Sequence, residues 1–196
     1  MQSQEIDIEE LKNSKEFLAN LELLEDEMNS QKSIQKGYQL LDSLLLIESD
    51  EDKINEIFSF IVNNSFDTLS NKLISKKSFD MKNSEEIATA RAIYEHGVSL
   101  YSENSFKSAK EIFLVLNFVI DNKELQDAMM IHAISTMKSM KFDEFMENIA
   151  DTSKYDENDE FAYFVKFFKV DTKKFFDDNQ KYLDKANKEL KVLKSS

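Results

Sequence analysis

The scarcity of proline and glycine is the feature that most constrains the fold of this chain. Its 196 residues contain no proline and only two glycines, Gly37 and Gly97. β-Hairpins and tight turns draw heavily on both residue types, so Asn, Ser and Asp must serve as turn formers. Because 41% of the residues are hydrophobic, the chain can still build a core. We therefore predict an all-α fold.

A helix–turn–helix pattern recurs within residues 90–149. In the first copy a helical run passes the small residue Gly97, reaches a polar turn, and a second apolar run opens at Phe106. The pattern returns about 36 residues later with Ala133, a polar break and Phe142, close to the ~34-residue period of tetratricopeptide repeats. We therefore predict a tetratricopeptide-like stack of helical hairpins.

The second helix of each predicted hairpin carries aromatic residues at helical spacing. Phe106, Ala109 and Phe113 share one face in the first copy, and Phe142 and Phe145 share one face in the second. A small residue lets two helices approach closely, and an aromatic ring fills the wedge between them. We expect Ala109 and Phe113 to be buried.

Helical spacing of apolar residues extends to both sides of the repeats. The additional helices that it predicts span about residues 8–28, 30–47, 53–63, 66–75, 160–170 and 172–193. We expect the last two to form a degenerate third hairpin, whose second helix caps the stack with a polar outer face.

The polar stretch 76–84 is the predicted domain boundary. It would separate an N-terminal helical region, residues 1–83, from the repeat region with its capping helix, residues 84–196. Two arrangements remain open for the first helix. It packs on the body, or it is a detachable arm that occupies a groove or a second subunit.

The acidic composition bears on the choice of partner. The formal net charge is −13, and Arg91 is the single arginine. Nucleic-acid binding and an anionic membrane surface both call for basic residues, so we expect a protein partner, no nucleic acid and no membrane insertion. The chain has no cysteine and begins without the basic and apolar segments of a signal peptide. We expect a cytoplasmic protein.

Residues that could support catalysis or bind a metal are few. His96 and His132 take equivalent places in the two hairpins, but no further ligands converge on them at helical spacing. The acidic stretches 49–52 and 151–160 lack the glycine of a calcium-binding loop. We therefore expect no enzyme activity, no metal and no cofactor.

Repeat alignment predicts a concave groove for a partner. The first helix of each hairpin lines the concave side of such a stack, and its residues here are rich in aromatic and methionine side chains, which suit adaptable peptide-binding surfaces. The predicted groove residues are Tyr94, Val98, Tyr101, Met130, Ile134, Met137, Phe164 and Phe168. The alternative is that these side chains are core residues, covered by the N-terminal helix.

Residues 93–121 and 128–150 resemble the class II chaperones of type III secretion translocators, the low-calcium-response H family. The residues that carry the resemblance are Tyr94, Gly97, Tyr101, Phe106, Ala109, Phe113, Ala133, Met137, Phe142 and Phe145. The resemblance implies an acidic, cytoplasmic, non-enzymatic chaperone. It would hold an extended segment of a secreted client in its concave groove and form a homodimer, as members of the family often do.

The sequence thus favours a protein-binding adaptor, and two rival functions remain. An acidic inhibitor or immunity protein would cover a basic toxin with the clusters at 50–52 and 156–160 instead of the groove. A structural subunit would remain in a fixed complex of a larger assembly.

Overall fold

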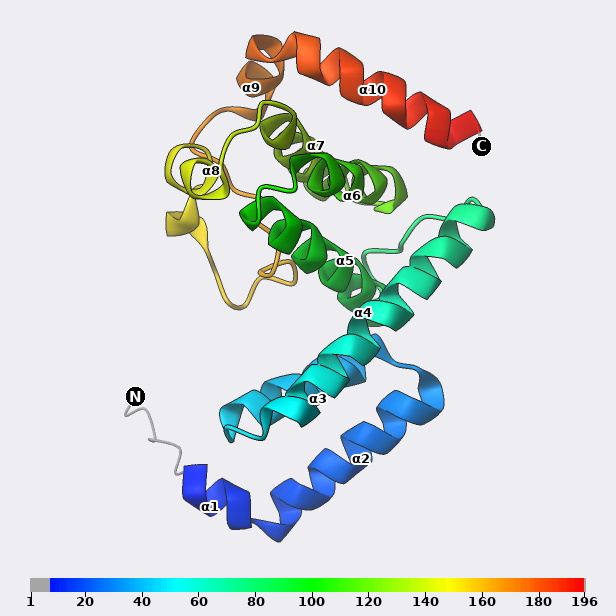
Figure 1. The fold of residues 1–196 in the computed structure, drawn as a ribbon, viewed down its shortest axis with the longest axis vertical. Helices are drawn as coiled ribbons and strands as arrows, with labels where there is room; N and C mark the ends of the chain where they lie inside the picture. The colour runs from blue at the N-terminus through cyan, green and yellow to red at the C-terminus, as the bar shows by residue number, and fades with distance from the viewer. Residues whose placement is uncertain (1–7, 196) are drawn as a thin grey trace. The chain divides into compact units, whose positions relative to one another are not determined.

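The computed structural model describes residues 8–195, and within this range it contains helices and no strands (Figure 1). The prediction of an all-α, helical-hairpin fold is confirmed. The helices are α1 (Ile8–Asn13), α2 (Lys15–Gln31), α3 (Ile34–Leu46), α4 (Glu51–Ile74), α5 (Ser84–Ser102), α6 (Phe106–Val119), α7 (Lys123–Met137), α8 (Phe142–Asn148), α9 (Thr172–Asp178) and α10 (Gln180–Ser195). The chain divides into two compact units between Thr68 and Leu69, inside α4.

In the first unit, two helix boundaries differ from the prediction. The helix predicted over 8–28 is interrupted at Ser14, whose hydroxyl accepts a hydrogen bond from the Phe17 N–H and so caps α2. By contrast, the predicted break between 63 and 66 does not occur. There the buried Ile61, Ser65 and Leu69 recur every four residues, so α4 continues, and Ser65 donates to the Ile61 carbonyl within it.

The second unit is built around α6, which packs against both α5 and α7. Ala109 and Phe113 are fully buried in α6, as predicted. Gly97 of α5 allows the close approach of α6, because a Cβ atom at this position would lie 2.8 Å from Cγ2 of Ile112. The first predicted hairpin therefore forms α5 and α6, and its small residue lies at their contact.

α8 packs against α5. The ring of Phe145 lies 5.8 Å from that of Tyr101 in α5 and 4.6 Å from that of His132 in α7. α10 covers α6 and α7. The single closing helix predicted over 172–193 is interrupted at Asn179, whose side-chain amide donates to the Phe175 carbonyl at the end of α9.

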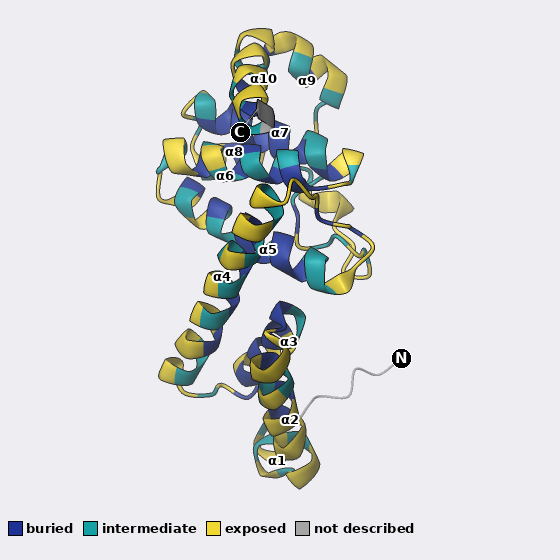
Figure 2. Cartoon of the chain, turned by 90° about the vertical axis from the view of Figure 1, so that its right-hand side faces the viewer, coloured by how far each residue is buried: buried dark blue, intermediate teal, exposed yellow. Residues whose placement is uncertain are grey.

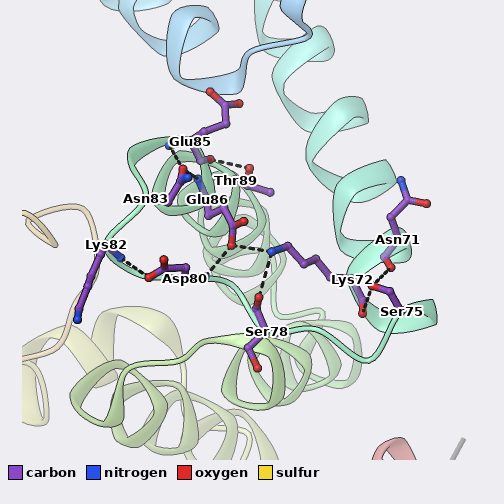
Figure 3. Close-up of polar contacts among 10 residues, drawn as sticks. All are labelled: Asn71, Lys72, Ser75, Ser78, Asp80, Lys82, Asn83, Glu85, Glu86 and Thr89. Atoms are coloured by element: carbon purple, nitrogen blue, oxygen red, sulfur yellow. Dashed lines mark hydrogen bonds and ion pairs between the residues drawn. The ribbon is translucent and has the colours of Figure 1, made fainter.

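The stretch between α4 and α5 is held within the second unit by one ion-pair cluster (Figure 3). The Lys72 ammonium lies 2.7 Å from the Glu86 carboxylate and donates to the Ser78 carbonyl, and Glu86 also accepts from the Asp80 N–H. Phe79 is fully buried. The polar residues predicted to form a domain boundary are therefore ordered against the start of α5.

The helix predicted over 160–170 is wrong. This stretch is irregular and lies between α8 and α9, in yellow to orange in Figure 1. Its phenylalanines have helical spacing, but the Val165 N–H donates to a side chain of α5 instead of a carbonyl four residues earlier. Phe164 and Phe168 are therefore not residues of a third hairpin.

The close approach at Gly97 gives a stability prediction. Gly97→Val should lower the free energy of unfolding by about 1–3 kcal/mol, because the branched side chain overpacks the α5–α6 contact. Ser99→Val, on the exposed side of the same helix, should stay within about 0.5 kcal/mol of the parent. Urea denaturation of the two variants measures the difference. Equal losses of unfolding free energy in both would show that the α5–α6 contact accommodates the larger side chain without cost.

Candidate functional site

Most of the predicted groove residues are buried in this structure. Tyr94, Tyr101, Met130, Ile134 and Phe164 are buried, whereas Val98, Met137 and Phe168 are half-exposed. Figure 2 shows the buried residues in dark blue on α5 and α7. Residues 161–168 of the same chain cover the α5–α7 side of the second unit. We call this segment the strap.

α5 and α7 hold the strap by the main chain of a single residue, Val165. Its N–H donates to the hydroxyl oxygen of Tyr94 in α5, over 3.1 Å. Its carbonyl oxygen lies 3.1 Å from Nε2 of His132 in α7. Because a carbonyl can only accept, this contact requires the hydrogen of the neutral imidazole on Nε2. Both polar groups of one residue are thus bound by side chains from two helices.

Aromatic contacts extend this attachment to both sides of Val165. The ring of Phe164 lies 5.1 Å from the ring of Tyr94, and Phe168 lies 6.3 Å from His132. Farther out, the Arg91 guanidinium lies 3.4 Å from the centre of the Tyr163 ring, in cation–π geometry. The strap therefore crosses from α5 to α7 with aromatic anchors along its length.

The strap also pairs with the chain that follows α8. The Lys169 N–H donates to the Ile149 carbonyl, and the Asp151 N–H donates to the Phe167 carbonyl. These bonds form an isolated antiparallel bridge between Ala150 and Phe168. The C-terminal end of the strap therefore has main-chain partners outside the α5–α7 face.

Tyr101 lies in the interior of the unit. It is fully buried, and its ring packs against Phe106 of α6 and against Phe142 and Phe145 of α8. Its hydroxyl has no hydrogen-bond partner among the described residues. Repeat alignment places it in the groove, but α8 packs over this part of α5, so Tyr101 is a core residue.

His132 binds the main chain of the strap, a contact that the sequence did not indicate. It is fully buried, and burial lowers its pKa to about 4. The proton gained by a cationic imidazole would go to Nδ1, which has no partner in the described part of the chain. The sequence signal was its place in the repeat beside Ala133, but that position does not reveal that it binds main chain.

A lysine of the strap is held by the acidic groups around it. The Lys166 ammonium lies 2.7 Å from Asp159 and 3.1 Å from Glu124, and near the rings of Phe161 and Phe167. Its side chain is only 6% exposed. Part of the predicted acidic surface is therefore used internally, to neutralise this cation.

Two further residues of the predicted acidic clusters make local hydrogen bonds. Asp50 accepts from the Lys53 N–H at the start of α4, and Asp156 accepts from the Asn158 N–H. Residues 151–167 also form a mostly apolar, partly open hollow of about 70 Å³, lined in part by Tyr155, Phe161 and Phe164. No group of three or more metal-binding side chains is found among residues 8–195.

Comparison with protein-family models finds no matching family, and comparisons with curated proteins and with solved structures find no match. Between residues 8 and 195, no helix combines the length and the apolar character that crossing a bilayer requires.

The buried imidazole predicts a pH-dependent stability. Between pH about 4 and pH 6.5 the unfolded chain has His132 protonated and the folded chain does not. The free energy of unfolding should therefore fall as the pH drops through this window, by up to about 3 kcal/mol from this one group. In His132→Gln that contribution is absent.

Urea denaturation at several pH values from 4 to 7 measures this difference between the parent and His132→Gln. The other titrating groups are common to both proteins, so they cancel in the comparison. The free energy of unfolding should change more steeply with pH in the parent, and the difference in slope should correspond to the binding of up to one proton. Parallel curves would mean that folded His132 takes up its proton as easily as the unfolded residue does.

Proposed function

We propose that this protein is a non-enzymatic adaptor that binds an extended segment of a protein partner on the face formed by α5 and α7. The observation that supports the proposal is the hydrogen bonding of Tyr94 and His132 to the main chain of Val165. Main-chain hydrogen bonds provide affinity for an extended segment whatever its sequence, while nearby side-chain contacts provide specificity. The α5–α7 face has both elements.

The resemblance to translocator chaperones supplies the more specific form of the proposal. In that form the protein is a cytoplasmic chaperone, and its partner is a secreted client held as an extended segment. A homodimer would agree with the same family. The net charge of −13 suits a partner with basic residues around the bound segment.

The test begins with affinity capture of partners from the source organism, followed by binding of the purified partner to variants. Val98→Glu combined with Met137→Glu places two charges at half-exposed positions of the predicted groove. Partner affinity should fall at least about tenfold, because an unpaired charge in a desolvated contact is costly. The matched control, Ser99→Glu with Ser102→Glu, adds the same charge at exposed positions of α5.

Circular dichroism and thermal melting must first show that both double variants are folded. A folded Val98→Glu, Met137→Glu protein that binds its partner like the control would locate the contact elsewhere. Charge reversal at the exposed Glu51, Asp52, Glu157 and Glu160 of the two acidic clusters would then test the acidic-inhibitor function. A partner that never exchanges would favour a structural subunit.

A further inference from the structure

We infer that the strap is a resident occupant of the α5–α7 face, and that the partner segment takes its place by presenting two aromatic residues separated by three others. This inference rests on the proposed function, since it names the kind of segment that the same face binds. This spacing of two aromatic residues is that of Phe164 and Phe168, which lie on either side of the bound Val165 main chain.

The first step concerns the polar groups of the face. The Tyr94 hydroxyl and Nε2 of His132 belong to buried residues, and both bind the main chain of Val165. The two groups also lie 3.3 Å from each other, so without an occupant they keep one mutual contact and lose both main-chain bonds, which is costly for buried polar groups. Every extended segment has an N–H and a carbonyl that could make the same two bonds, so this part of the interaction does not discriminate between sequences.

The second step concerns the side chains, which do discriminate. Among the aromatic residues of 161–168, Phe164 is the buried one, with 4% of its surface exposed, and it packs against the Tyr94 ring. Phe168 lies near both His132 and Phe145. A competing segment therefore needs an aromatic residue in each place, and a basic residue at the position of Lys166 would keep the ion pair with Glu124.

The third step concerns the remaining hold on the strap. Lys166 pairs with Glu124, and the main chain at Phe168 forms a bridge with Ala150. Elsewhere most residues of the strap are half-exposed, and Tyr163 is 51% exposed although it stacks on Arg91. The strap has no regular helix to unwind. Its exchange for a similar segment therefore replaces one set of main-chain bonds and aromatic contacts by an equivalent set. It leaves the α5–α6–α7 packing in place.

The experiment uses the full chain and a fluorescein-labelled peptide with the sequence of residues 159–170. Phe164→Ala removes the buried anchor of the strap, so the open state is more populated and the apparent Kd of the peptide should fall at least about tenfold from the parent value. Phe176→Ala, at a half-buried aromatic position in α9, is the matched control and should bind like the parent. Fluorescence anisotropy measures the affinities.

A second peptide, with alanine in place of both Phe164 and Phe168, should bind at least about tenfold more weakly than the first. Equal binding of the two peptides would overturn the aromatic pattern. A folded Phe164→Ala protein that binds the first peptide no better than Phe176→Ala would show that the strap is a fixed part of the core.

Tyr163→Trp provides a measurement that does not depend on the folding of Phe164→Ala. The chain contains no tryptophan, so this half-exposed position becomes a single fluorescent reporter stacked on Arg91. Unlabelled peptide should shift its emission to longer wavelength as the strap leaves the face. Peptide binding without that shift would place the peptide elsewhere and overturn the exchange.

The two proposals fail in different ways. If Val98→Glu with Met137→Glu abolishes partner binding but the strap peptide does not bind, the adaptor function stands and the exchange is wrong. If the strap peptide binds by exchange but partner binding is insensitive to the groove variant, the face binds peptides and the captured partner uses another surface.

Discussion

The ring of Phe113 is the contact on which the second unit depends. From α6 it lies 6.1 Å from Tyr94 and 6.3 Å from Tyr101, both in α5, and 4.9 Å from His132 in α7. Gly97 and Ala109 leave room for α5 and α6 to close around it. The same ring therefore fixes the helix packing and the positions of the two side chains that bind Val165.

The chemistry of the α5–α7 face follows from this burial. Desolvation keeps His132 neutral at physiological pH, so the face offers a tyrosine hydroxyl and a neutral imidazole without a formal charge. Such groups suit the main chain of a peptide, whose N–H and carbonyl are also neutral. The charged groups hold the strap on either side of Val165: Arg91 stacks on the exposed Tyr163, and Glu124 pairs with Lys166.

The strap also covers apolar surface of the α5–α7 face, which the proposed function assigns to a partner. Large exposed apolar patches on isolated proteins promote association. The strap covers Tyr94 with Phe164 and leaves half-exposed residues on its outer side. Under the proposed exchange, the face is covered both before and after the partner binds.

The sequence by itself determined the all-α class, the α5–α6 hairpin and the burial of Ala109 and Phe113, because local periodicity and small-residue spacing encode them. It could not reveal that α4 continues through Asn64 and Ser65 or that Ser14 interrupts the first helix, since such side chains can cap a helix or lie within it according to local geometry. The strap was decided by tertiary structure alone. The phenylalanines of 161–168 fit a helix equally well, but the partners of the Val165 main chain come from Tyr94 and His132, far away in the sequence.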